Sequence, residues 1–211
     1  MNSTTNTALV LQARDVCFAY PQRPLLANVS LLSPTGVSLV RGGDGAGKTT
    51  LLRILAGEVT ADSGQVQLGD IHSHHQATDY KKQVFWVDPR TTAFDAITPH
   101  AYWAQIQLQH AQFDAQALAG LIDGLSLTEH VDKSLYMLST GSKRKVFLAA
   151  AIASNALLTL LDDPLAAIDK PSINFVLAQL RAAAQAAQRV YVIAHYEALG
   201  DVPLAAMVDL G

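Results

Sequence analysis

The chain has 211 residues, half of them hydrophobic, and a formal net charge of −3. This length suits one domain with a well-filled core. The acidic balance and the lack of a basic block argue against a nucleic-acid partner, because phosphate backbones are bound by clustered lysines and arginines. The single cysteine, Cys17, excludes an internal disulfide and favours a cytosolic location.

The hydrophobic stretches are too short to cross a bilayer. Residues 1–7 are polar and carry no apolar signal core. The most apolar stretch, 146–161, is interrupted by Ser154 and Asn155 and is followed by two aspartates. This pattern predicts a helix followed by a buried strand rather than a span of about 20 apolar residues. We therefore expect no direct membrane insertion, and any attachment to a membrane must come through a partner.

In chain order, residues 9–40 predict short strands. The strand-breaking residues that divide this region are Pro21, Pro24, Pro34 and Gly36. Its last run, 37–40, predicts a buried strand that leads into a glycine-rich turn. A helix is expected over 49–56, where apolar residues recur at helical spacing, and it should end at Gly57.

Alternating apolar residues predict the next strands at 63–68 and 84–87. From about residue 99 to residue 133 the sequence is helical, and we expect an inserted helical lobe over about residues 90–150. The remaining elements follow in the order strand, helix, last core strand: residues 157–161, 172–188 and 190–194. Strands that alternate with helices predict an α/β fold with a mostly parallel sheet and helices on both faces.

A phosphate-binding loop is expected between the strand at 37–40 and the helix at 49–56. Its residues are Gly42, Gly43, Asp44, Gly45, Ala46, Gly47, Lys48, Thr49 and Thr50. Glycines let the backbone turn tightly and present N–H groups to phosphate oxygens, and the helix adds its N-terminal dipole. In this pattern Lys48 reaches the β and γ phosphates and the Thr49 hydroxyl ligates Mg²⁺. The strand before and the helix after argue against a chance glycine turn.

The strand at 157–161 is followed by two carboxylates, Asp162 and Asp163. Asp162 stands where a nucleotide hydrolase holds Mg²⁺, often through water. Asp163 stands where a base orients or deprotonates the attacking water. Alone, the pattern also fits a buried strand with an acidic exit turn, but the phosphate loop earlier in the chain favours a nucleotide site.

With a third motif, the chain resembles the ATP-binding cassette family. Residues 137–146 read Met-Leu-Ser-Thr-Gly-Ser-Lys-Arg-Lys-Val, which is similar to the family signature Leu-Ser-Gly-Gly-Gln followed by a basic helix. Leu138, Ser139 and Gly141 match the signature, and residues 143–145 supply the basic run. The family's signature caps the γ-phosphate held by a second subunit, so the resemblance implies nucleotide contacts for Ser139 and Gly141. A solvated basic helix start is the alternative.

Further positions match the family. Tyr20 stands where an aromatic residue stacks on adenine, with a core tyrosine as the alternative. Residues 166–169 resemble the short loop that crosses the dimer interface. His195 matches the histidine that contacts the γ-phosphate, with a satisfied loop histidine as the alternative. The resemblance thus implies catalytic roles for Lys48, Asp163 and His195.

The resemblance implies one nucleotide-binding domain over residues 1–211 with the P-loop fold of the family. That fold has a parallel core sheet, an antiparallel β subdomain and an inserted helical subdomain, here about residues 90–150. The implied protein is an ATPase that uses ATP and Mg²⁺ and pairs with a second cassette subunit as a homodimer or heterodimer. It drives an integral membrane transporter subunit from the cytoplasmic face. The short single-cassette layout is also similar to the haem-export branch of cytochrome c maturation.

Three departures from the family leave the rate of hydrolysis open. The segment 86–90 lacks the family's glutamine, and Asp88 is the candidate replacement as a metal ligand. Asp163 stands in place of a glutamate and is one methylene shorter, so its carboxylate sits about 1.5 Å back. Thr140 and Ser142 replace a glycine and the glutamine of the signature.

The sequence leaves two alternatives to a transport ATPase. One is a slow or degenerate ATP-dependent switch subunit of a heteromeric complex. The other is a soluble cassette outside transport, which the single minimal cassette and the lack of a basic surface run disfavour. The transported substrate and the direction of transport are not encoded in this chain, because both depend on the membrane subunit.

The histidine-rich segment 72–75 raises the question of a metal site. It has no cysteine nearby and no paired ligand spacing. We therefore expect a solvated loop there.

Overall fold

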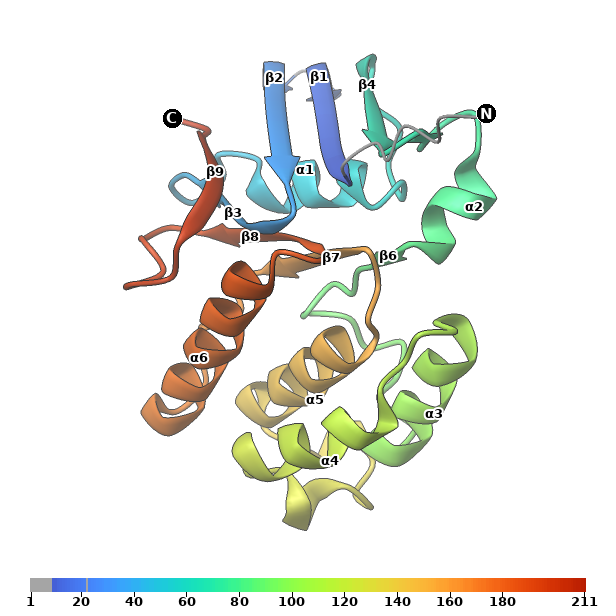
Figure 1. Cartoon of the computed structure of the whole chain (residues 1–211), viewed down its shortest axis with the longest axis vertical. Helices are drawn as coiled ribbons and strands as arrows, with labels where there is room; N and C mark the ends of the chain where they lie inside the picture. The colour runs from blue at the N-terminus through green and yellow to red at the C-terminus, as the bar shows by residue number, and fades with distance from the viewer. Residues whose placement is uncertain (1–8, 22) are drawn as a thin grey trace, which may run out of the picture.

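The computed structural model describes residues 9–21 and 23–211, so the polar segment 1–7 lies outside the described residues. An antiparallel sheet lies at one end of the molecule, a parallel sheet crosses its middle and a group of helices fills the other end (Figure 1). Helix α1 (Lys48–Leu55) lies between the two sheets. The parallel sheet is therefore the central layer.

The antiparallel sheet has the order β2-β1-β4-β5, with β1 (Val10–Tyr20), β2 (Arg23–Pro34), β4 (Ser63–Leu68) and β5 (Ile71–His72). The parallel sheet has the order β6-β7-β8-β3-β9, with β3 (Gly36–Arg41), β6 (Val84–Phe85), β7 (Leu158–Asp162), β8 (Val190–His195) and β9 (Leu204–Asp209). The other helices are α2 (Ala77–Lys82), α3 (Pro99–Gln109), α4 (Ala115–Gly124), α5 (Thr140–Ala153) and α6 (Lys170–Ala186). Short 3₁₀ turns lie at Thr128–His130 and Leu135–Met137.

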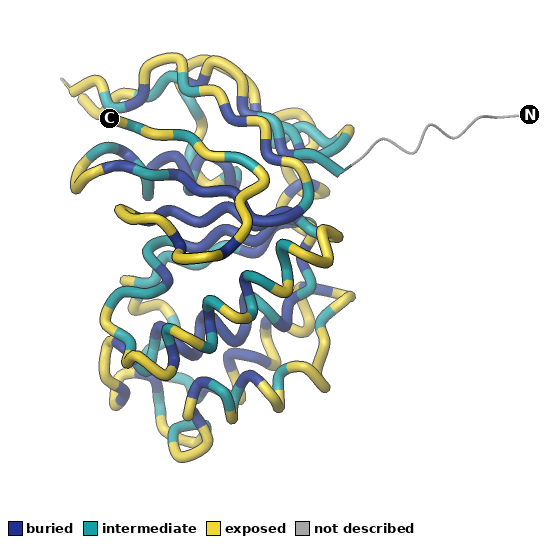
Figure 2. The backbone as a smooth tube through the Cα atoms, turned by 60° about the vertical axis from the view of Figure 1, so that its left-hand side comes forward, coloured by how far each residue is buried: buried dark blue, intermediate teal, exposed yellow. Residues whose placement is uncertain are grey.

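The central sheet is buried on both faces. Along β8, Val190, Val192 and Ala194 join the core shared with α1 and the antiparallel sheet. The alternate residues, Tyr191 and Ile193, join the core shared with α5 and α6. Each of these five side chains is at most 2 % exposed, and Figure 2 shows the strands as the buried centre of the molecule. The predicted α/β fold with helices on both faces of a parallel sheet is confirmed.

The helices expected between β6 and β7 are present as α3, α4 and α5. Thr98 accepts a hydrogen bond from the Ala101 N–H and starts α3, and Asp114 does the same for α4 through the Ala117 N–H. Trp103 of α3 is 2 % exposed and donates from Nε1 to the Val146 carbonyl of α5 at 3.0 Å. These contacts join the helices into one group, and its treatment as a separate helical subdomain stays a prediction.

The strands expected before the phosphate loop are present as β1, β2 and β3, but β1 and β2 are long, and Pro24 does not divide β2. Pro24 pairs with Ala19 near the start of β2, and Pro34, the last residue of β2, pairs with Val10. β2 is an edge strand with a hydrogen-bonded neighbour on one side only. Proline is tolerated at such an edge, because its missing N–H can face away from the ladder.

Several elements differ from the sequence-based expectation in length or were missed. The strand expected at 84–87 covers only Val84–Phe85. Helix α2 and strands β5 and β9 were not predicted. β9 lies at the edge of the parallel sheet beside β3, and most of its residues are exposed. It therefore lacks the buried apolar run that marks the central strands in the sequence.

The parallel register brings three strand ends to one edge of the central sheet. Arg41, the last residue of β3, pairs with His195, and Asp162, the last residue of β7, pairs with Ala194. The phosphate loop follows β3, and Asp163 follows β7. In open α/β sheets, ligands bind outside the carboxyl ends of the strands. The fold thus gathers the predicted nucleotide-binding residues at this edge.

Candidate functional site

The phosphate loop makes a tight turn between β3 and α1. Gly47 is the N-cap of α1 with φ 98°, and Gly45 has φ +75°. A Cβ atom on Gly47 would lie 2.8 Å from Cδ2 of Leu26. Glycine is therefore required at the residue that starts the helix. The free N–H groups of the first turn of α1 then face the loop, as in anion-binding helix starts.

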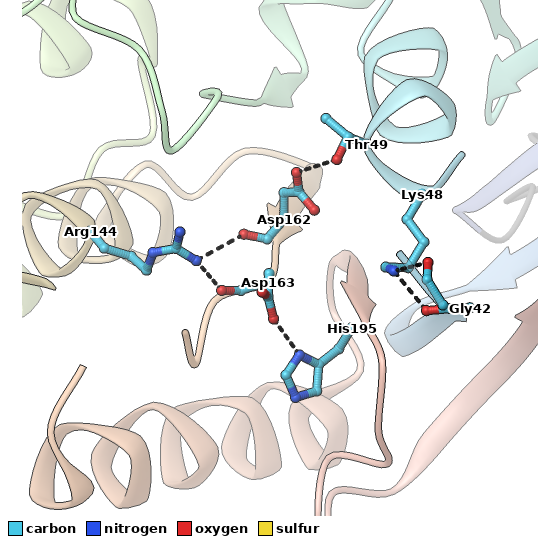
Figure 3. A network of polar contacts seen from close by, with 8 residues as sticks. Gly42, Lys48, Thr49, Arg144, Asp162, Asp163 and His195 are labelled. Atoms are coloured by element: carbon cyan, nitrogen blue, oxygen red, sulfur yellow. Dashed lines mark hydrogen bonds and ion pairs between the residues drawn. The ribbon is translucent and has the colours of Figure 1, made fainter. Parts of the chain in front are cut away.

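Lys48 lies across this loop. Its Nζ donates to the carbonyl oxygens of Gly42 at 2.6 Å and Gly43 at 2.8 Å (Figure 3). Neutral backbone oxygens therefore hold the ammonium group within the loop. Phosphate oxygens bind such a cation more strongly, because both partners of the hydrogen bond are charged.

The two residues predicted to ligate Mg²⁺, Thr49 and Asp162, are in contact. Thr49 Oγ1 donates to Asp162 Oδ2 at 2.7 Å. Burial raises the pKa of the Asp162 carboxyl, while the hydrogen bond from Thr49 and the charge of Arg90 act in the opposite direction. A hydroxyl and a carboxylate are hard oxygen donors of the kind that Mg²⁺ takes. The donor set therefore fits this ion.

Asp163 lies in a strained turn, with φ 48°. Its N–H donates to the carbonyl of Ala194 at 2.8 Å, and its Oδ1 lies 2.6 Å from Nδ1 of His195. The Asp163 side chain is 40 % exposed, whereas that of His195 is 6 % exposed. A buried imidazole thus fixes the direction of a half-exposed carboxylate.

One cavity of about 310 Å³ joins these groups. Its lining residues are Tyr20, Arg23, Leu25, residues 44–50, Arg90, Asp162 and Asp163. Tyr20 is 44 % exposed, so the alternative of a core tyrosine is wrong. The structure therefore brings the phosphate loop, the candidate adenine-stacking residue and both carboxylates to one site.

Two arginines of this cavity were missed in the sequence. Arg23 starts β2 and Arg90 lies in the loop after β6. Both are remote in sequence from the phosphate loop, and no spacing pattern marks them. They add positive charge to a site that already contains Lys48, which favours a polyanionic ligand.

Asp88 shapes the loop that presents Arg90. Its Oδ1 accepts the Arg90 N–H at 2.9 Å. Arg90 lines the cavity, but Asp88 is not among the lining residues. A metal-binding role for Asp88 stays a prediction.

The signature residues lie away from the nucleotide cavity of their own chain. Ser139 is exposed and caps α5, since its Oγ accepts the Ser142 N–H at 3.0 Å. Gly141 is buried, and a Cβ atom there would lie 2.2 Å from the carbonyl oxygen of Ala167. Gly141 is therefore needed for the close packing of α5 on the loop at 166–169.

Two basic residues after the signature, Arg144 and Lys145, join α5 to the segment between β7 and α6. Lys145 forms an ion pair with Asp169 and holds the pKa of that carboxyl well below its usual range. Asp169 also caps α6 by accepting the Ser172 N–H at 2.9 Å. Arg144 Nη1 donates to the carbonyl of Asp163 and lies 3.5 Å from the carbonyl of Asp162 (Figure 3). The signature helix and the acidic turn are thus in direct contact.

The histidine segment 72–75 begins at the end of β5 and continues into a turn, with His74 and His75 exposed. Within residues 9–21 and 23–211, no three side chains of the His, Cys, Asp or Glu type are grouped so as to hold a metal ion. In the same part of the chain, no helix has the length and hydropathy needed to span a membrane.

Comparison with known proteins gives consistent matches. A family model described as ABC transporter matches residues 26–166. The cytochrome c biogenesis ATP-binding export protein CcmA of Yersinia pestis is 31% identical over 170 residues, covering 80% of this chain and 78% of the relative. The protein of the same name from Legionella pneumophila is 31% identical over 175 residues, covering 82% and 86%. The likeness to the cytochrome c maturation branch is confirmed.

A solved structure supports the fold. A putative ABC transporter ATP-binding protein from Pyrococcus furiosus superposes with a TM-score of 0.75, at 24% identity, over 95% of this chain and 97% of that protein.

Proposed function

Since this chain belongs to the ABC transporter family, we propose that it binds and hydrolyses ATP to drive a separate membrane-embedded transporter subunit. The observation that carries the proposal is the convergence of Lys48, Thr49, Asp162, Asp163 and Tyr20 on one cavity. The names of the relatives, ATP-binding export proteins of cytochrome c biogenesis, support export as the direction.

Each residue around the cavity has a chemical part in this proposal. Lys48 and the N–H groups of the phosphate loop bind the phosphates of ATP. Thr49 and Asp162 would hold Mg²⁺, which would supply positive charge against the charge that develops on the phosphates. Asp163 accepts a hydrogen bond from the attacking water and takes its proton as the water oxygen bonds to the γ-phosphorus and ADP leaves. His195 keeps the Asp163 carboxylate in place, and Tyr20 packs on the base.

The slow-switch alternative also has a specific observation in its favour. Asp163 is one methylene shorter than the family's glutamate, and one of its two carboxylate oxygens is already bonded to His195. Oδ2 is the oxygen with no hydrogen-bond partner among the described residues, so the position of a water molecule depends mainly on it. A displacement of about 1 Å can lower a rate by about 10²-fold, so turnover below that of a fast ATPase fits the same geometry.

Removal of the Lys48 ammonium group should weaken ATP binding. Lys48→Ala deletes a charge-assisted contact worth about 1.5–3 kcal/mol, or about 10-fold to 150-fold in affinity. Isothermal titration of Mg-ATP into wild type and variant measures the difference. Lys82→Ala is the matched control, because Lys82 is exposed on α2 and its one ion-pair partner among the described residues is Asp79. Equal ATP affinity in wild type and Lys48→Ala would contradict the proposed binding site.

Two copies of the cassette are proposed to close over ATP. Ser139 is exposed at the start of α5 and lies outside the lining of its own cavity. A helix start with free N–H groups is an anion site, and the anion it fits is the γ-phosphate bound by a second subunit. The partner is a second copy or a related cassette.

ATP should therefore produce a dimer of the Asp163→Asn variant, in which slow hydrolysis preserves the bound nucleotide. Adding Thr140→Trp should abolish the dimer, because Thr140 is exposed beside Ser139 and a bulky ring there blocks approach. Leu108→Trp is the control, since Leu108 is 88% exposed on α3. Static light scattering measures the mass. A monomer under all conditions would rule out the homodimer and leave the heterodimer.

The proposed docking site for the membrane subunit is a groove beside α3. The groove has a volume of about 450 Å³ and is lined by Thr78, Lys81, Lys82, Val84, Phe85, Trp86, Ile106, Gln109 and His110. Trp86 Nε1 is buried and has no hydrogen-bond partner in the described part of the chain. Residues 86–90 connect this groove to Arg90 at the nucleotide cavity. A partner seated in the groove would therefore sense the bound nucleotide through one short loop.

A photoreactive residue at Gln109, exposed on the groove, should cross-link to an integral membrane protein in native membranes. The same residue at Leu32, which is 61% exposed on the antiparallel sheet, serves as the control and should not. Mass spectrometry of the adduct identifies the partner. Equal cross-linking from both positions, or adducts only with soluble proteins, would contradict this docking site.

A further inference from the structure

We infer that Arg144 is a positioning residue for hydrolysis, which holds the Asp163 turn so that its carboxylate faces the attacking water. This inference rests on the proposed function, because it assumes that Asp163 is the catalytic carboxylate. The resemblance to the family gave only a basic run at residues 143–145. The structure gives each of these three residues a different partner.

The three basic side chains diverge from α5. Lys143 Nζ pairs with Asp95 Oδ1 at 2.6 Å, within the helical group. Lys145 pairs with Asp169 at the start of α6. Arg144 alone reaches the acidic end of β7, where Figure 3 shows its guanidinium beside the backbone of Asp162 and Asp163.

Arg144 completes the fixation of a residue in an unfavourable backbone conformation. Asp163 has φ 48°, a left-handed backbone conformation that is unfavourable for a residue other than glycine. Its N–H is held by the Ala194 carbonyl, and its own carbonyl accepts from both Arg144 and the Ala166 N–H. Without Arg144, that carbonyl keeps only the hydrogen bond from Ala166 among the described residues. The strained turn is then held less tightly, and the direction of the carboxylate that contacts His195 is less fixed.

The environment of Arg144 is not that of a group selected for stability alone. Its side chain is buried, with 9 % exposure, and Nε has no hydrogen-bond partner among the described residues. Burial lowers the pKa of the guanidinium, and the charges of Asp163 and Asp162 oppose that shift. An incompletely satisfied buried charge is a poor stabilising device. Its placement against the backbone carbonyls of Asp162 and Asp163 is the feature that accounts for it.

Arg144 acts through Asp163 and not on the nucleotide. It is absent from the residues that line the nucleotide cavity, although both carboxylates line it. A small second cavity of about 20 Å³ separates Arg144 from Val87 and Pro89 of the loop after β6. Loss of Arg144 should therefore slow hydrolysis while ATP affinity changes little. A purely structural anchor would instead lower stability and ATP affinity together.

The first test compares wild type with Arg144→Met and Arg144→Lys in single-turnover hydrolysis at saturating Mg-ATP. Arg144→Met keeps the apolar stem and removes every donor, and it should lower the rate by about 10-fold to 100-fold. Arg144→Lys retains one cationic group and should lower it by about 3-fold to 10-fold. ATP affinity should stay within about twofold of wild type in both. Arg181→Met is the control and should leave the rate unchanged, because the one ion-pair partner of Arg181 among the described residues is the exposed Asp201.

The second test asks whether Arg144 works through Asp163. In the Asp163→Asn background, adding Arg144→Met should change the remaining rate by less than about twofold, because coupled residues are not additive. If Arg144→Met lowers the hydrolysis rate by the same factor in the wild-type and Asp163→Asn backgrounds, the inference is overturned. An unchanged hydrolysis rate in Arg144→Met would also overturn it, and so would a loss of ATP affinity as large as the loss of rate. If Arg144→Met does not fold, the same comparisons with Arg144→Lys decide the question.

The Asp163→Asn and Arg144→Met variants also distinguish a failure of this inference from a failure of the proposed function. If Asp163→Asn alone hydrolyses as fast as wild type, Asp163 is not the catalytic carboxylate, and both the hydrolytic assignment and the inference fall. If Asp163→Asn is slow and Arg144→Met is as fast as wild type, only the inference falls.

Discussion

The site depends on the left-handed turn at Asp163, where β7 leaves the central sheet. Two elements of the fold meet at this residue: β8 holds its N–H through Ala194 and its carboxylate through His195, and α5 holds its carbonyl through Arg144. The backbone strain at φ 48° persists because all three polar groups are satisfied. Aspartate is among the few residues that tolerate this region, since its short polar side chain can bond locally.

The same turn connects the nucleotide cavity to surfaces on which partners are proposed to dock. Arg144 ties it to α5, whose start carries the exposed Ser139. On the other side, Arg90 links the cavity to the loop that begins at Trp86 and its groove. A change in the position of Asp162 and Asp163 would therefore shift α5 and the proposed dimer surface at its start. A change in the groove would reach the cavity through a loop of a few residues.

The sequence predicted the parts of the site that depend on contiguous residues. The phosphate loop, the acidic end of β7 and the signature-like helix start are short patterns of contiguous residues, and the first two have local physical causes: glycine turns and strand burial. The parallel sheet followed from the alternation of buried strands with helices.

The remaining features arise from contacts between distant residues. Arg23 and Arg90 enter the cavity only because β2 and the loop after β6 fold beside the phosphate loop. No pattern in the sequence indicates the contact of Arg144 with the Asp163 carbonyl. Strand β9 was missed because its position at the sheet edge leaves most of its residues exposed. Pro24 was wrongly expected to break a strand, because the sequence does not show that β2 is an edge strand, where proline is tolerated.

Single-turnover hydrolysis by wild type, Asp163→Asn and Asp163→Glu, each saturated with Mg-ATP, tests the central claim most directly. The account predicts that Asp163→Asn loses most of the rate, on the order of 10²-fold or more, because an amide cannot take the water's proton. It predicts a modest gain for Asp163→Glu. The extra methylene restores the reach of the carboxylate toward the water. Glutamate is less favourable than aspartate in a left-handed turn, however, and the family's glutamine is still absent from segment 86–90. Hydrolysis by Asp163→Asn at the wild-type rate would contradict the claim that this turn positions the catalytic carboxylate.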